Sequence, residues 1–592
     1  MADDLLGRIG NLLNRRPWYK LPRLFAMGRL VEIRNELRQK NLHDTEEPPL
    51  ECHAAPVTPT PEQREGRTLD GTFNDLKCPS MGSAGRRFGR NVPLEHVFPD
   101  TANLMVPNPR VVSRELMTRD EFKPVTILNL TAAAWIQFMV HDWFVHARST
   151  TAEIDIPIAS GDDWGSPTMR VPRTEPDPAP EGSTRPPAYK NLNSHWWDAS
   201  HIYACHPQLA DSLRSHIGGK LRIEATGLLP VDPVTGLHFS GFTDNWWIGL
   251  AMLHTLFTLE HNAICDQLAH LNPGWTDQQL YAKAKVINSA LMAKIHTVEW
   301  TPAILPHPVI QRAMNVNWSG LAGEELQEVL EFLDDKELVG GIVGSTADHH
   351  AAPYSLTEEF VAVYRMHPLM PDDYEFRSLT TGGVLEKRTL AEIAGNRTPA
   401  IAERITMQDL FYSFGVSHPG AITLHNYPRH LQNLTRDDGE RLDLAAVDVL
   451  RDRERGVPRY NQFRRLLRKE PVKSFDELTE NPTWRKQLNE VYNGDLEKVD
   501  LMTGLFAEPL PEGFGFSETA FRVFVLMASR RLKSDRFFTD DFRPEIYTEF
   551  GIEYLKKNSM LTVLRRHYPH LAPALDGVKN AFHPWKHAGA KA

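Results

Sequence analysis

The sequence predicts a mainly α-helical fold, with one large catalytic domain and long loops. Apolar residues recur at helical spacing over long stretches, whereas runs of strict apolar–polar alternation, the pattern of strands, are scarce. The 592 residues, 41% of them hydrophobic, are also enough to bury a large core. The helical stretches that we expect are residues 131–147, 247–271, 276–302, 355–366 and 518–533.

Loops are predicted from proline. Residues 159–190 contain seven prolines, and this density excludes a helix, so we expect a long excursion there. Residues 44–66, rich in Pro, Glu and Thr, are expected to connect an N-terminal segment to the catalytic domain. We therefore divide the chain into residues 1–90, an arm with its connecting segment, and residues 91–592, the catalytic domain.

The arm has an unusual composition. Residues 8–40 carry nine Lys or Arg against two Glu, interleaved with apolar side chains that include Trp18 and Phe25. This mixture fits an amphipathic element that makes peripheral contact with a membrane or gathers a lipid-like substrate. The alternative is an arm packed on the main body of the protein.

Charge and hydropathy exclude several classes of protein. The 66 basic and 76 acidic residues give a net charge of −10, without the basic bias of a nucleic-acid-binding domain. No apolar run reaches the roughly 18 residues of a membrane-spanning helix. The first residues include acids where a secretory signal would be positive. We expect a cytoplasmic globular enzyme, with membrane contact at most peripheral and no nucleic-acid partner.

The four cysteines are Cys52, Cys78, Cys205 and Cys265. They lie too far apart for a CxxC zinc pattern and are too few for a disulfide scaffold. A reducing compartment is the simpler interpretation.

The first candidate site residues lie in the apolar segment 135–144. Gln137 and His141 are four residues apart and so share one face of a helix, whereas Asp142 is on another side. Polar groups within a buried helix require partners or a function. Taken alone, a histidine placed like His141 is more often a satisfied core histidine than a functional one.

A second segment, residues 353–368, pairs a tyrosine with a histidine. Ser355 and Glu358 fit a capping box, which predicts the start of a helix. Tyr364 and His367 then lie three residues apart on one face, and Pro368 ends the helix. A metal-binding histidine would donate its other ring nitrogen to a nearby acceptor. A Tyr/His pair in a packing seam would have the same spacing.

A third segment, residues 193–203, is rich in small oxygen-bearing side chains. Ser194, Trp196, Asp198 and Ser200 alternate, so an extended loop could direct hydroxyl, carbonyl and carboxylate oxygens at one point. Calcium prefers six to eight oxygens of this kind. A surface turn rich in Asp and Ser would look similar.

Together and in order, these segments resemble the haem peroxidase–cyclooxygenase superfamily, and most closely its fatty-acid α-dioxygenases. The similarity runs from about residue 90 to about residue 580. Each motif is short, but the ordered set is specific. The motifs are QFMVHD (137–142), WWDASHIY (196–203), EHNAICD (260–266), KIHTVEWT (294–301), VYRMHP (363–368), LHNYP (424–428), RDRERGVPRYN (451–461) and ASRR (528–531).

The resemblance implies two cofactors, haem and calcium. It makes His141 the distal haem histidine with Gln137 beside it, His367 the axial iron ligand, and Asn426 the acceptor that orients the His367 ring. It also implies a calcium ion held by five residues: Asp142, Ser194, Trp196 through its carbonyl, Asp198 and Ser200.

The implied reaction is haem-dependent insertion of O₂ at carbon 2 of a fatty acid, which gives a 2-hydroperoxy acid. Tyr364 matches the tyrosine that the family converts to a radical, while His296, Thr301 and Arg531 match the group that holds the substrate carboxylate. Arg531 lies in an apolar stretch, where a guanidinium needs an anionic partner; the alternative partner is a protein carboxylate. Arg530 is expected at the surface.

Departures from the superfamily pattern favour the dioxygenase branch. Val140 replaces the aspartate that esterifies haem in mammalian-type peroxidases, and residues 243–247 (TDNWW) lack the usual Arg and haem-linking Glu. We therefore expect non-covalent haem b and weak peroxidase chemistry. The alternatives are a haem peroxidase, another oxylipin-forming fatty-acid dioxygenase, or a non-catalytic haem- or lipid-binding protein.

Overall fold

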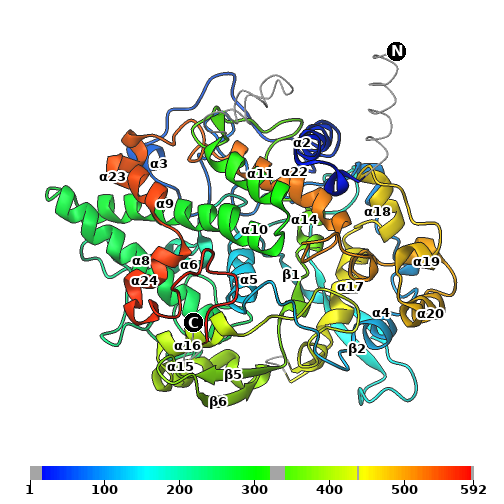
Figure 1. Ribbon diagram of the computed structural model, residues 1–592. Coiled ribbons are helices and arrows are strands. Elements are labelled where there is room, and N and C mark those ends of the chain that lie inside the picture. Colours follow the sequence, from blue (N-terminus) through cyan, green and yellow to red (C-terminus); the bar gives the residue numbers. More distant parts are fainter. Residues whose placement is uncertain (1–16, 321–339, 436–438, 588–592) are drawn as a thin grey trace, which may run out of the picture.

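The computed structural model describes residues 17–320, 340–435 and 439–587. Helices dominate the described residues, which confirms the predicted fold class (Figure 1). The α-helices are α2 (Arg23–Lys40), α3 (Pro61–Glu65), α4 (Pro109–Val112), α5 (Thr131–Trp143), α6 (Ser200–Tyr203), α7 (Pro207–Ser212), α8 (Ile248–Leu271), α9 (Asp277–Ile295), α10 (Thr301–Ile304), α11 (Pro308–Ser319), α14 (Glu358–Val363), α15 (Thr398–Arg404), α16 (Met407–Val416), α17 (Leu444–Glu454), α18 (Tyr460–Leu466), α19 (Phe475–Leu478), α20 (Pro482–Val491), α21 (Leu501–Ala507), α22 (Glu518–Ser534), α23 (Pro544–Lys557) and α24 (Met560–His567).

Strands occur only as short antiparallel pairs among the described residues: β1 (Arg148–Pro157) with β2 (Thr168–Thr174), β3 (Pro176–Asp177) with β4 (Ala188–Tyr189), β5 (Asp373–Arg377) with β6 (Val384–Thr389), and β7 (Leu434–Thr435) with β8 (Arg441–Leu442). Residues 159–190 contain no helix, as predicted, but they contain β2 to β4. The hairpin was missed because β1 carries five polar residues before its first buried one, Ile154, so alternation is visible only at its end.

The long helices surround α5, which lies near the centre of Figure 1. Helices α8 and α9 run side by side at the left of that view, and α5 packs against α8. Nearly all of α5 is buried, including Trp135, His141, Asp142 and Trp143. The first helix of the sequence prediction is therefore confirmed as a core element, although it ends at Trp143 rather than at residue 147.

Two other predicted boundaries differ from the structure. The helix predicted at 276–302 begins with a capping box between Thr276 and Gln279, then changes at His296 to one π-helical turn, η5 (His296–Trp300). The capping box predicted from Ser355 is wrong: Thr357 caps α14, because its hydroxyl accepts the backbone N–H of Phe360. Helix α14 also ends at Val363, before the predicted Tyr364–His367 face is complete.

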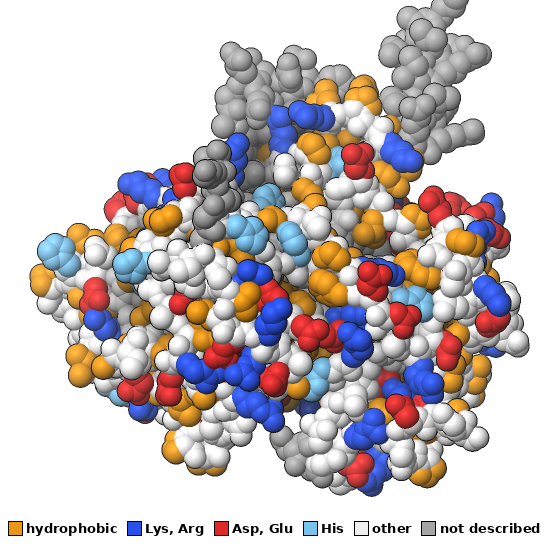
Figure 2. All heavy atoms as spheres, turned by 60° about the horizontal axis from the view of Figure 1, so that its bottom comes forward, with side chains coloured by type: hydrophobic (Ala, Val, Ile, Leu, Met, Phe, Trp, Pro, Cys, Tyr) orange, Lys and Arg blue, Asp and Glu red, His pale blue; other side chains and the backbone are white. Residues whose placement is uncertain are grey.

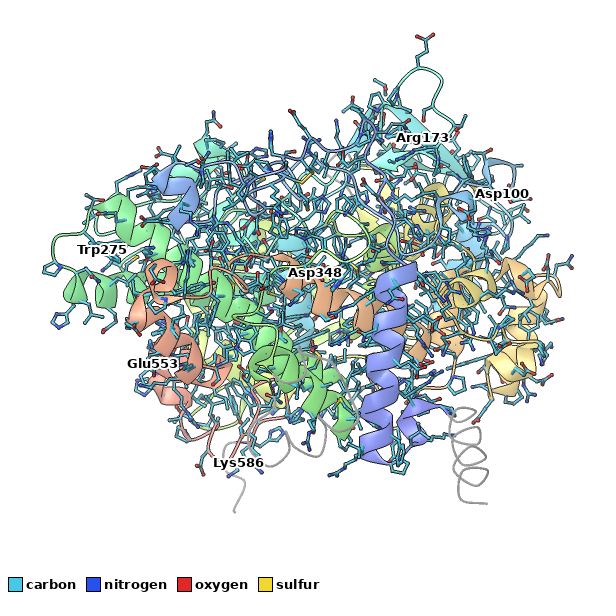
Figure 3. The ribbon with its side chains drawn as sticks, turned by 90° about the horizontal axis from the view of Figure 1, so that it is seen from above. Asp100, Arg173, Trp275, Asp348, Glu553 and Lys586 are labelled. Atoms are coloured by element: carbon cyan, nitrogen blue, oxygen red, sulfur yellow. A yellow bond between two sulfur atoms is a disulfide. The ribbon has the colours of Figure 1, made fainter. Side chains whose placement is uncertain are left out.

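The N-terminal arm packs on the main body. Figure 3, seen from above, shows α2 lying against α22 and α11. Helix α2 buries Met27, Leu30, Ile33 and Leu37 in the same core as α5, α8 and α22. The alternative of a packed arm is therefore correct for residues 17–40; the basic residues before residue 17 lie outside the described part. No helix in the described part is long and apolar enough to cross a membrane.

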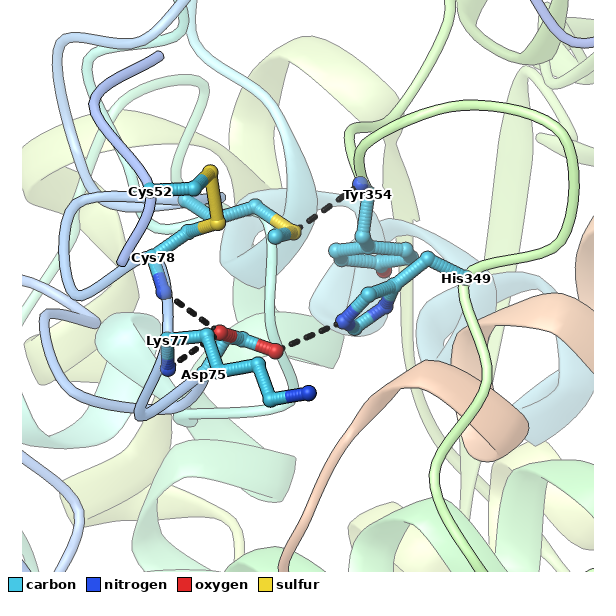
Figure 4. The surroundings of a disulfide bond; sticks show 7 residues. Cys52, Asp75, Lys77, Cys78, His349 and Tyr354 are labelled. Carbon is cyan, nitrogen blue, oxygen red and sulfur yellow. Dashed lines mark hydrogen bonds and ion pairs between the residues drawn. A yellow bond between two sulfur atoms is a disulfide. The ribbon is translucent and has the colours of Figure 1, made fainter. Parts of the chain in front are cut away.

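A disulfide joins Cys52 to Cys78, so the interpretation of the cysteines as reduced thiols is wrong for this pair (Figure 4). Disulfides are typical of oxidising compartments, and a reducing one is no longer the simpler interpretation. The bond closes a loop whose Asp75 accepts a hydrogen bond from His349 at 2.8 Å and another from the backbone N–H of Cys78. The loop is thereby fixed to residues 349–354.

Charges are mixed on the surface. Figure 2 shows Lys and Arg side chains interspersed with Asp and Glu over the face that it presents, with apolar side chains scattered between them. Large side chains that are more than a third exposed include Leu24 and Phe25, neighbours near the start of α2.

Candidate active site

Helix α5 presents the predicted distal residues. His141 is only 6% exposed, and its Nδ1 atom is buried with no hydrogen-bond partner in the described structure. Burial, assisted by nearby His201, lowers the pKa of His141 to about 3, so the imidazole is neutral at neutral pH. Gln137 lies one turn earlier, where its Oε1 accepts a 2.8 Å hydrogen bond from the indole N–H of Trp247.

His367 begins the short 3₁₀ turn η6 (His367–Leu369) that follows α14. Its Nδ1 lies 2.8 Å from Oδ2 of Asp448 on α17, and its side chain is 33% exposed, unlike most of its neighbours. Burial alone would raise the pKa of Asp448, but His367 and Arg365 outweigh that effect and lower it. A histidine with one nitrogen close to a carboxylate and the other available is a common arrangement for a metal ligand.

The contact predicted for Asn426 is wrong. Its Oδ1 accepts from Nε of Arg119 and from the backbone N–H of Lys123, and its Nδ2 donates to the carbonyls of Lys123 and Ala421. Both ends of the amide are thus engaged away from His367. Asn426 supports that segment indirectly, since Arg119 donates to the carbonyl of Pro368. Asp448 takes the place that the sequence analysis gives to Asn426.

Tyr364 lies among aromatic rings. Its ring centre is 4.7 Å from that of Phe524 on α22, 4.6 Å from Phe360 and 5.2 Å from Trp143. Burial raises the pKa of the phenol well above its ordinary value, so the oxygen keeps its proton. No hydrogen bond joins this hydroxyl to another residue in the described part of the chain.

Arg531, on α22, is 1% exposed and has no carboxylate partner among the described residues. Instead, its guanidinium carbon lies 3.9 Å from the ring centre of Trp197 and 4.3 Å from that of Trp143. Its Nε and Nη2 atoms have no hydrogen-bond partner, and neither have the indole nitrogens of the two tryptophans. A buried cation with unused donors is costly unless an anion binds there.

The prediction that Arg530 is a surface charge is wrong. Arg530 is 1% exposed, and its guanidinium donates to the carbonyls of His349, Ala352, Pro353 and Ser355. The two adjacent arginines therefore differ. Backbone carbonyls accept hydrogen bonds from Arg530, whereas Nε and Nη2 of Arg531 have no hydrogen-bond partner.

The π-helical turn η5 brings His296 and Thr301 together although they are five residues apart. The wide turn places the Thr301 hydroxyl 2.9 Å from the His296 carbonyl, to which it donates. Burial and the nearby Arg531 lower the pKa of His296 well below its ordinary value. Because Nδ1 of this neutral ring accepts from the indole N–H of Trp135, Nε2 carries the proton and can donate it to an anion.

An apolar cavity of about 50 Å³ adjoins this group. Thr301 and Phe524 line it, and Phe524 also stacks on Tyr364. The remaining lining residues come from α2, α11 and α22, among them Met27, Leu30, Val31, Ile310, Met314, Phe521 and Val525. The cavity therefore extends from Thr301, the one member of the polar group that lines it, to α2 of the N-terminal arm.

The predicted calcium residues are also brought together, at the C-terminal end of α5. The Ser194 hydroxyl donates to Oδ2 of Asp198 at 2.6 Å, and the backbone N–H of Ser200 donates to Oδ1 of Asp142 at 2.5 Å. The Ser200 hydroxyl is buried without a partner. The Trp196 backbone N–H donates to Ser194, so the loop curls around that hydroxyl.

Basic groups share this loop. Arg67 donates to the other oxygen of Asp198, at 3.0 Å, and to Asp535. Burial lowers the pKa of Lys285 to about 8, although Asp198 and Asp142 partly counteract it. Within the described ranges, no group of three His, Cys, Asp or Glu side chains is arranged to hold a metal. A calcium ion would therefore depend on hydroxyl and carbonyl oxygens beside the two carboxylates.

Sequence reasoning missed three kinds of residue. It did not identify Asp448, whose spacing of four from Asp452 on a buried helix is a detectable signal. It also missed the tryptophans that pack on Arg531 and His296, and Phe524 beside Tyr364. These aromatic residues carry no signal, because an aromatic residue in a buried helix is ordinarily part of the core.

Comparison with known proteins gives one family. The family model for animal haem peroxidase matches residues 66–581. The chain is 37% identical to alpha-dioxygenase PIOX of Oryza sativa subsp. japonica, over 96% of this chain and 93% of that protein. It is 36% identical to alpha-dioxygenase 1 of Arabidopsis thaliana, over 96% and 90% of the two chains.

Solved structures agree. A crystal structure of a variant of Oryza sativa fatty acid alpha-dioxygenase with palmitic acid matches with a TM-score of 0.89 and 35% identity, over 98% of this chain and 97% of that one. The Arabidopsis thaliana fatty acid alpha-dioxygenase matches with a TM-score of 0.88 at 35% identity, over 98% and 91%. Peroxidase A from Dictyostelium discoideum, at 20% identity and a TM-score of 0.70, shares the fold.

Proposed function

The chain belongs to the animal haem peroxidase family, and we propose that it is a haem-dependent fatty-acid α-dioxygenase, which inserts O₂ at carbon 2 of a fatty acid. One observation carries the proposal beyond the family. The buried guanidinium of Arg531 has two unused donors and lies near Tyr364, and Phe524, which stacks on Tyr364, lines an apolar cavity together with Thr301. This arrangement suits an anionic head and an apolar tail.

The charge of Arg531 attracts the carboxylate of the fatty acid, and directional hydrogen bonds fix its orientation. Arg531 supplies a planar, permanently charged donor that binds a carboxylate through two parallel hydrogen bonds. Neutral His296 adds a second donor, its Nε2–H. The Thr301 hydroxyl adds a third once it rotates away from the His296 carbonyl, to which it now donates. A cation and neutral donors attract the anion without placing a competing carboxylate beside it.

The chemistry at carbon 2 is a radical reaction. Its C–H bond is too weakly acidic for an ordinary base, so we assign hydrogen-atom removal to the oxygen of Tyr364 in its radical form. The substrate radical then adds O₂, and the peroxyl radical takes a hydrogen atom back from Tyr364. Atoms balance as fatty acid plus O₂ giving 2-hydroperoxy acid, and the tyrosyl radical is restored.

The residues present fit a haem. His367, with Asp448 beside its Nδ1, would hold the iron through its other ring nitrogen, and the buried Nδ1 of His141 is an unpartnered polar atom that would serve the bound group. When bound, the haem supplies the one-electron oxidation that Tyr364 requires. Val140 offers no carboxylate for an ester bond, so we propose non-covalent haem b, removable by acidified organic solvent.

The distal group acts on protons. With its pKa lowered to about 3, His141 is an uncharged imidazole at neutral pH, and it would be able to hold and release a proton beside the bound haem. Gln137, one turn before His141 on α5, is held by a hydrogen bond from Trp247. Burial of Phe360, Trp143 and Tyr364 keeps water from the radical site.

We further propose a structural calcium ion between α5 and the loop of residues 194–200. Its support is the convergence of Asp142, Asp198, Ser194 and Ser200, together with the unpartnered Ser200 hydroxyl. The ion would connect that loop to the helix that carries His141. The Trp196 carbonyl is proposed as a further ligand by resemblance.

Peripheral membrane contact is also proposed, through the start of α2. Leu24 and Phe25 are 40% and 52% exposed beside the basic residues Lys20 and Arg23, and α2 contributes lining to the cavity. The test is cosedimentation with anionic vesicles, which should fall for the double variant Leu24→Ser, Phe25→Ser. Equal sedimentation of both proteins would remove this surface from the proposal.

The function itself is tested by oxygen uptake. Purified haem-loaded protein should consume O₂ with palmitic acid, without added peroxide, and yield the 2-hydroperoxy acid. A peroxidase would instead need hydrogen peroxide, and a non-catalytic binding protein would bind palmitate without consuming O₂. Either result would replace the proposal by the corresponding alternative.

A further inference from the structure

Trp143 occupies the centre of the site. Its ring centre lies 4.3 Å from the guanidinium carbon of Arg531, 5.0 Å from the His296 ring and 5.2 Å from the Tyr364 ring. The side chain is fully buried, at 0% exposure. We infer that Trp143 is a positioning residue that sets the distance between the carboxylate anchor and Tyr364, and thereby selects the carbon that reacts. The inference rests on the proposed function.

The three contacts have defined directions. Arg531 lies over the face of the indole, as cations prefer on aromatic rings. The rings of His296 and Tyr364 meet it at 88° and 80°, the edge-to-face orientation that aromatic pairs favour. A tryptophan side chain is a rigid bicycle with two rotatable bonds. Once α5 fixes its backbone, the groups that touch it are held at fixed positions relative to one another.

The distance between the carboxylate anchor and Tyr364 decides the product, because carbons 2 and 3 of the fatty acid are close together. Carbon 3 is one bond, about 1.5 Å, beyond carbon 2 in the chain. Misplacement of a reacting atom by about 1 Å can reduce the rate roughly 100-fold. The anchor Arg531 lies on α22, whereas Tyr364 is the residue that follows α14, and Trp143 contacts both. Loss of that contact should therefore loosen selectivity rather than only reduce binding.

Trp197 provides a matched comparison. Its ring is 3.9 Å from the Arg531 guanidinium carbon and 5.8 Å from the His296 ring, so it packs on the anchor as Trp143 does. No ring contact joins Trp197 to Tyr364 in the part of the chain that the structure describes. If the contact with Tyr364 sets the selectivity for carbon 2, substitution of Trp143 should change the product, whereas substitution of Trp197 should not. Both substitutions should weaken carboxylate binding by Arg531.

The experiment compares Trp143→Phe, Trp197→Phe and wild type as haem-loaded full-length proteins with palmitic acid. Haem content, kcat and KM are measured, and hydroperoxides are reduced and assigned to carbon 2 or carbon 3 by mass spectrometry. We expect Trp143→Phe to keep its haem, to raise KM as Trp197→Phe does, to lose about tenfold or more in kcat, and to give a measurable share of carbon 3 product. Trp197→Phe should raise KM and retain carbon 2 selectivity.

Exclusive carbon 2 product from Trp143→Phe, with wild-type kcat, would overturn the inference, as would a carbon 3 product of equal share from Trp197→Phe. If Trp143→Phe does not retain haem, Trp143→Tyr is judged by the same criteria. Its hydroxyl fills more of the space that the indole leaves than phenylalanine does. Absence of oxygen uptake by wild type would instead contradict the proposed function, so the two failures are distinguishable.

Discussion

Nδ1 of His367 lies 2.8 Å from Oδ2 of Asp448. The same carboxylate oxygen accepts a 2.8 Å hydrogen bond from the hydroxyl of Tyr427, while Oδ1 accepts one of 2.6 Å from Arg365. Asp448 is 2% exposed, so its charge is sustained by these partners. A carboxylate in this position makes an imidazole a stronger electron donor to the metal that it binds.

Asp448→Asn should therefore raise the reduction potential of the bound haem and weaken haem retention about 10- to 100-fold. Spectroelectrochemical titration and haem content would measure the two effects. Asp452→Asn is the matched control, because Asp452 pairs with Arg365 at 3.0 Å but not with His367. An unchanged potential in Asp448→Asn, or the same shift in both variants, would separate Asp448 from the iron ligand.

Tyr364→Phe should retain the haem spectrum and lose fatty-acid oxygenation. Phenylalanine keeps the contacts with Phe360, Phe524 and Trp143 but has no O–H bond to exchange with the substrate. Tyr568→Phe is a suitable control, since Tyr568 has a buried hydroxyl without a partner and belongs to the C-terminal segment. Oxygen uptake equal to wild type by Tyr364→Phe would remove this residue from the mechanism.

Arg531→Ala should weaken fatty-acid use by roughly ten- to several-hundred-fold, because a charge-assisted hydrogen bond contributes about 1.5–3 kcal/mol and about 1.4 kcal/mol is tenfold. Arg531→Lys should fall between Ala and wild type, since it keeps the charge but not the planar pair of donors. The measurement is kcat/KM with palmitate, alongside haem content. Equal losses with palmitate and with guaiacol, a neutral peroxidase substrate, would indicate that Arg531 supports the fold.

If calcium is bound, chelation should lower the melting temperature and haem content of the wild type, and Asp198→Asn should already show both losses. Asp198 also pairs with Arg67, so stability alone cannot separate the two functions of this carboxylate. The deciding result is the added effect of chelator: large in wild type and small in Asp198→Asn. Elemental analysis of active wild-type protein that finds no calcium would leave Asp198 as the partner of Arg67.

Much of the fold was accessible from the sequence because its main helices carry clear local signals. Helix α8 and helix α22 begin and end within one residue of their predicted bounds. Where a boundary depends on competition between neighbouring caps, prediction failed: Ser355 has the right residue type, but Thr357 makes the hydrogen bond. The disulfide was missed because pairing of Cys52 with Cys78 depends on loops that periodicity does not describe.

The candidate site could be predicted from the sequence only in part, because its contacts depend on tertiary packing. Motifs identify residues by type and order, so they indicated His141, His367, Tyr364 and Arg531. They do not say which acceptor faces a ring nitrogen, since that depends on tertiary packing. Asn426 stands in a motif, yet its amide is bonded to the Arg119 side chain and the Lys123 backbone, and the contact with His367 comes from Asp448.

Glu299, in the π-helical turn between His296 and Thr301, should make stability depend on pH. Burial raises the pKa of its carboxyl from 4.5 to about 7, although the backbone N–H of Met560 and nearby Lys294 oppose that rise. Between these two pH values the folded protein holds a proton that the unfolded chain has released. Stability therefore falls as the pH rises from about 4.5 to about 7, and stays at the lower level above that.

Glu299→Gln should remove this dependence, because glutamine keeps an acceptor for the Met560 N–H and cannot ionise. Wild type and variant should melt alike near pH 4.5, whereas at pH 8 the variant should be more stable by up to about 3 kcal/mol, or roughly 2 °C in a chain of this length. Glu553→Gln is the control: Lys556 lowers the pKa of exposed Glu553, which is ionised throughout this range. Parallel melting curves for wild type and Glu299→Gln from pH 5 to pH 8 would show that Glu299 is ionised in the folded protein.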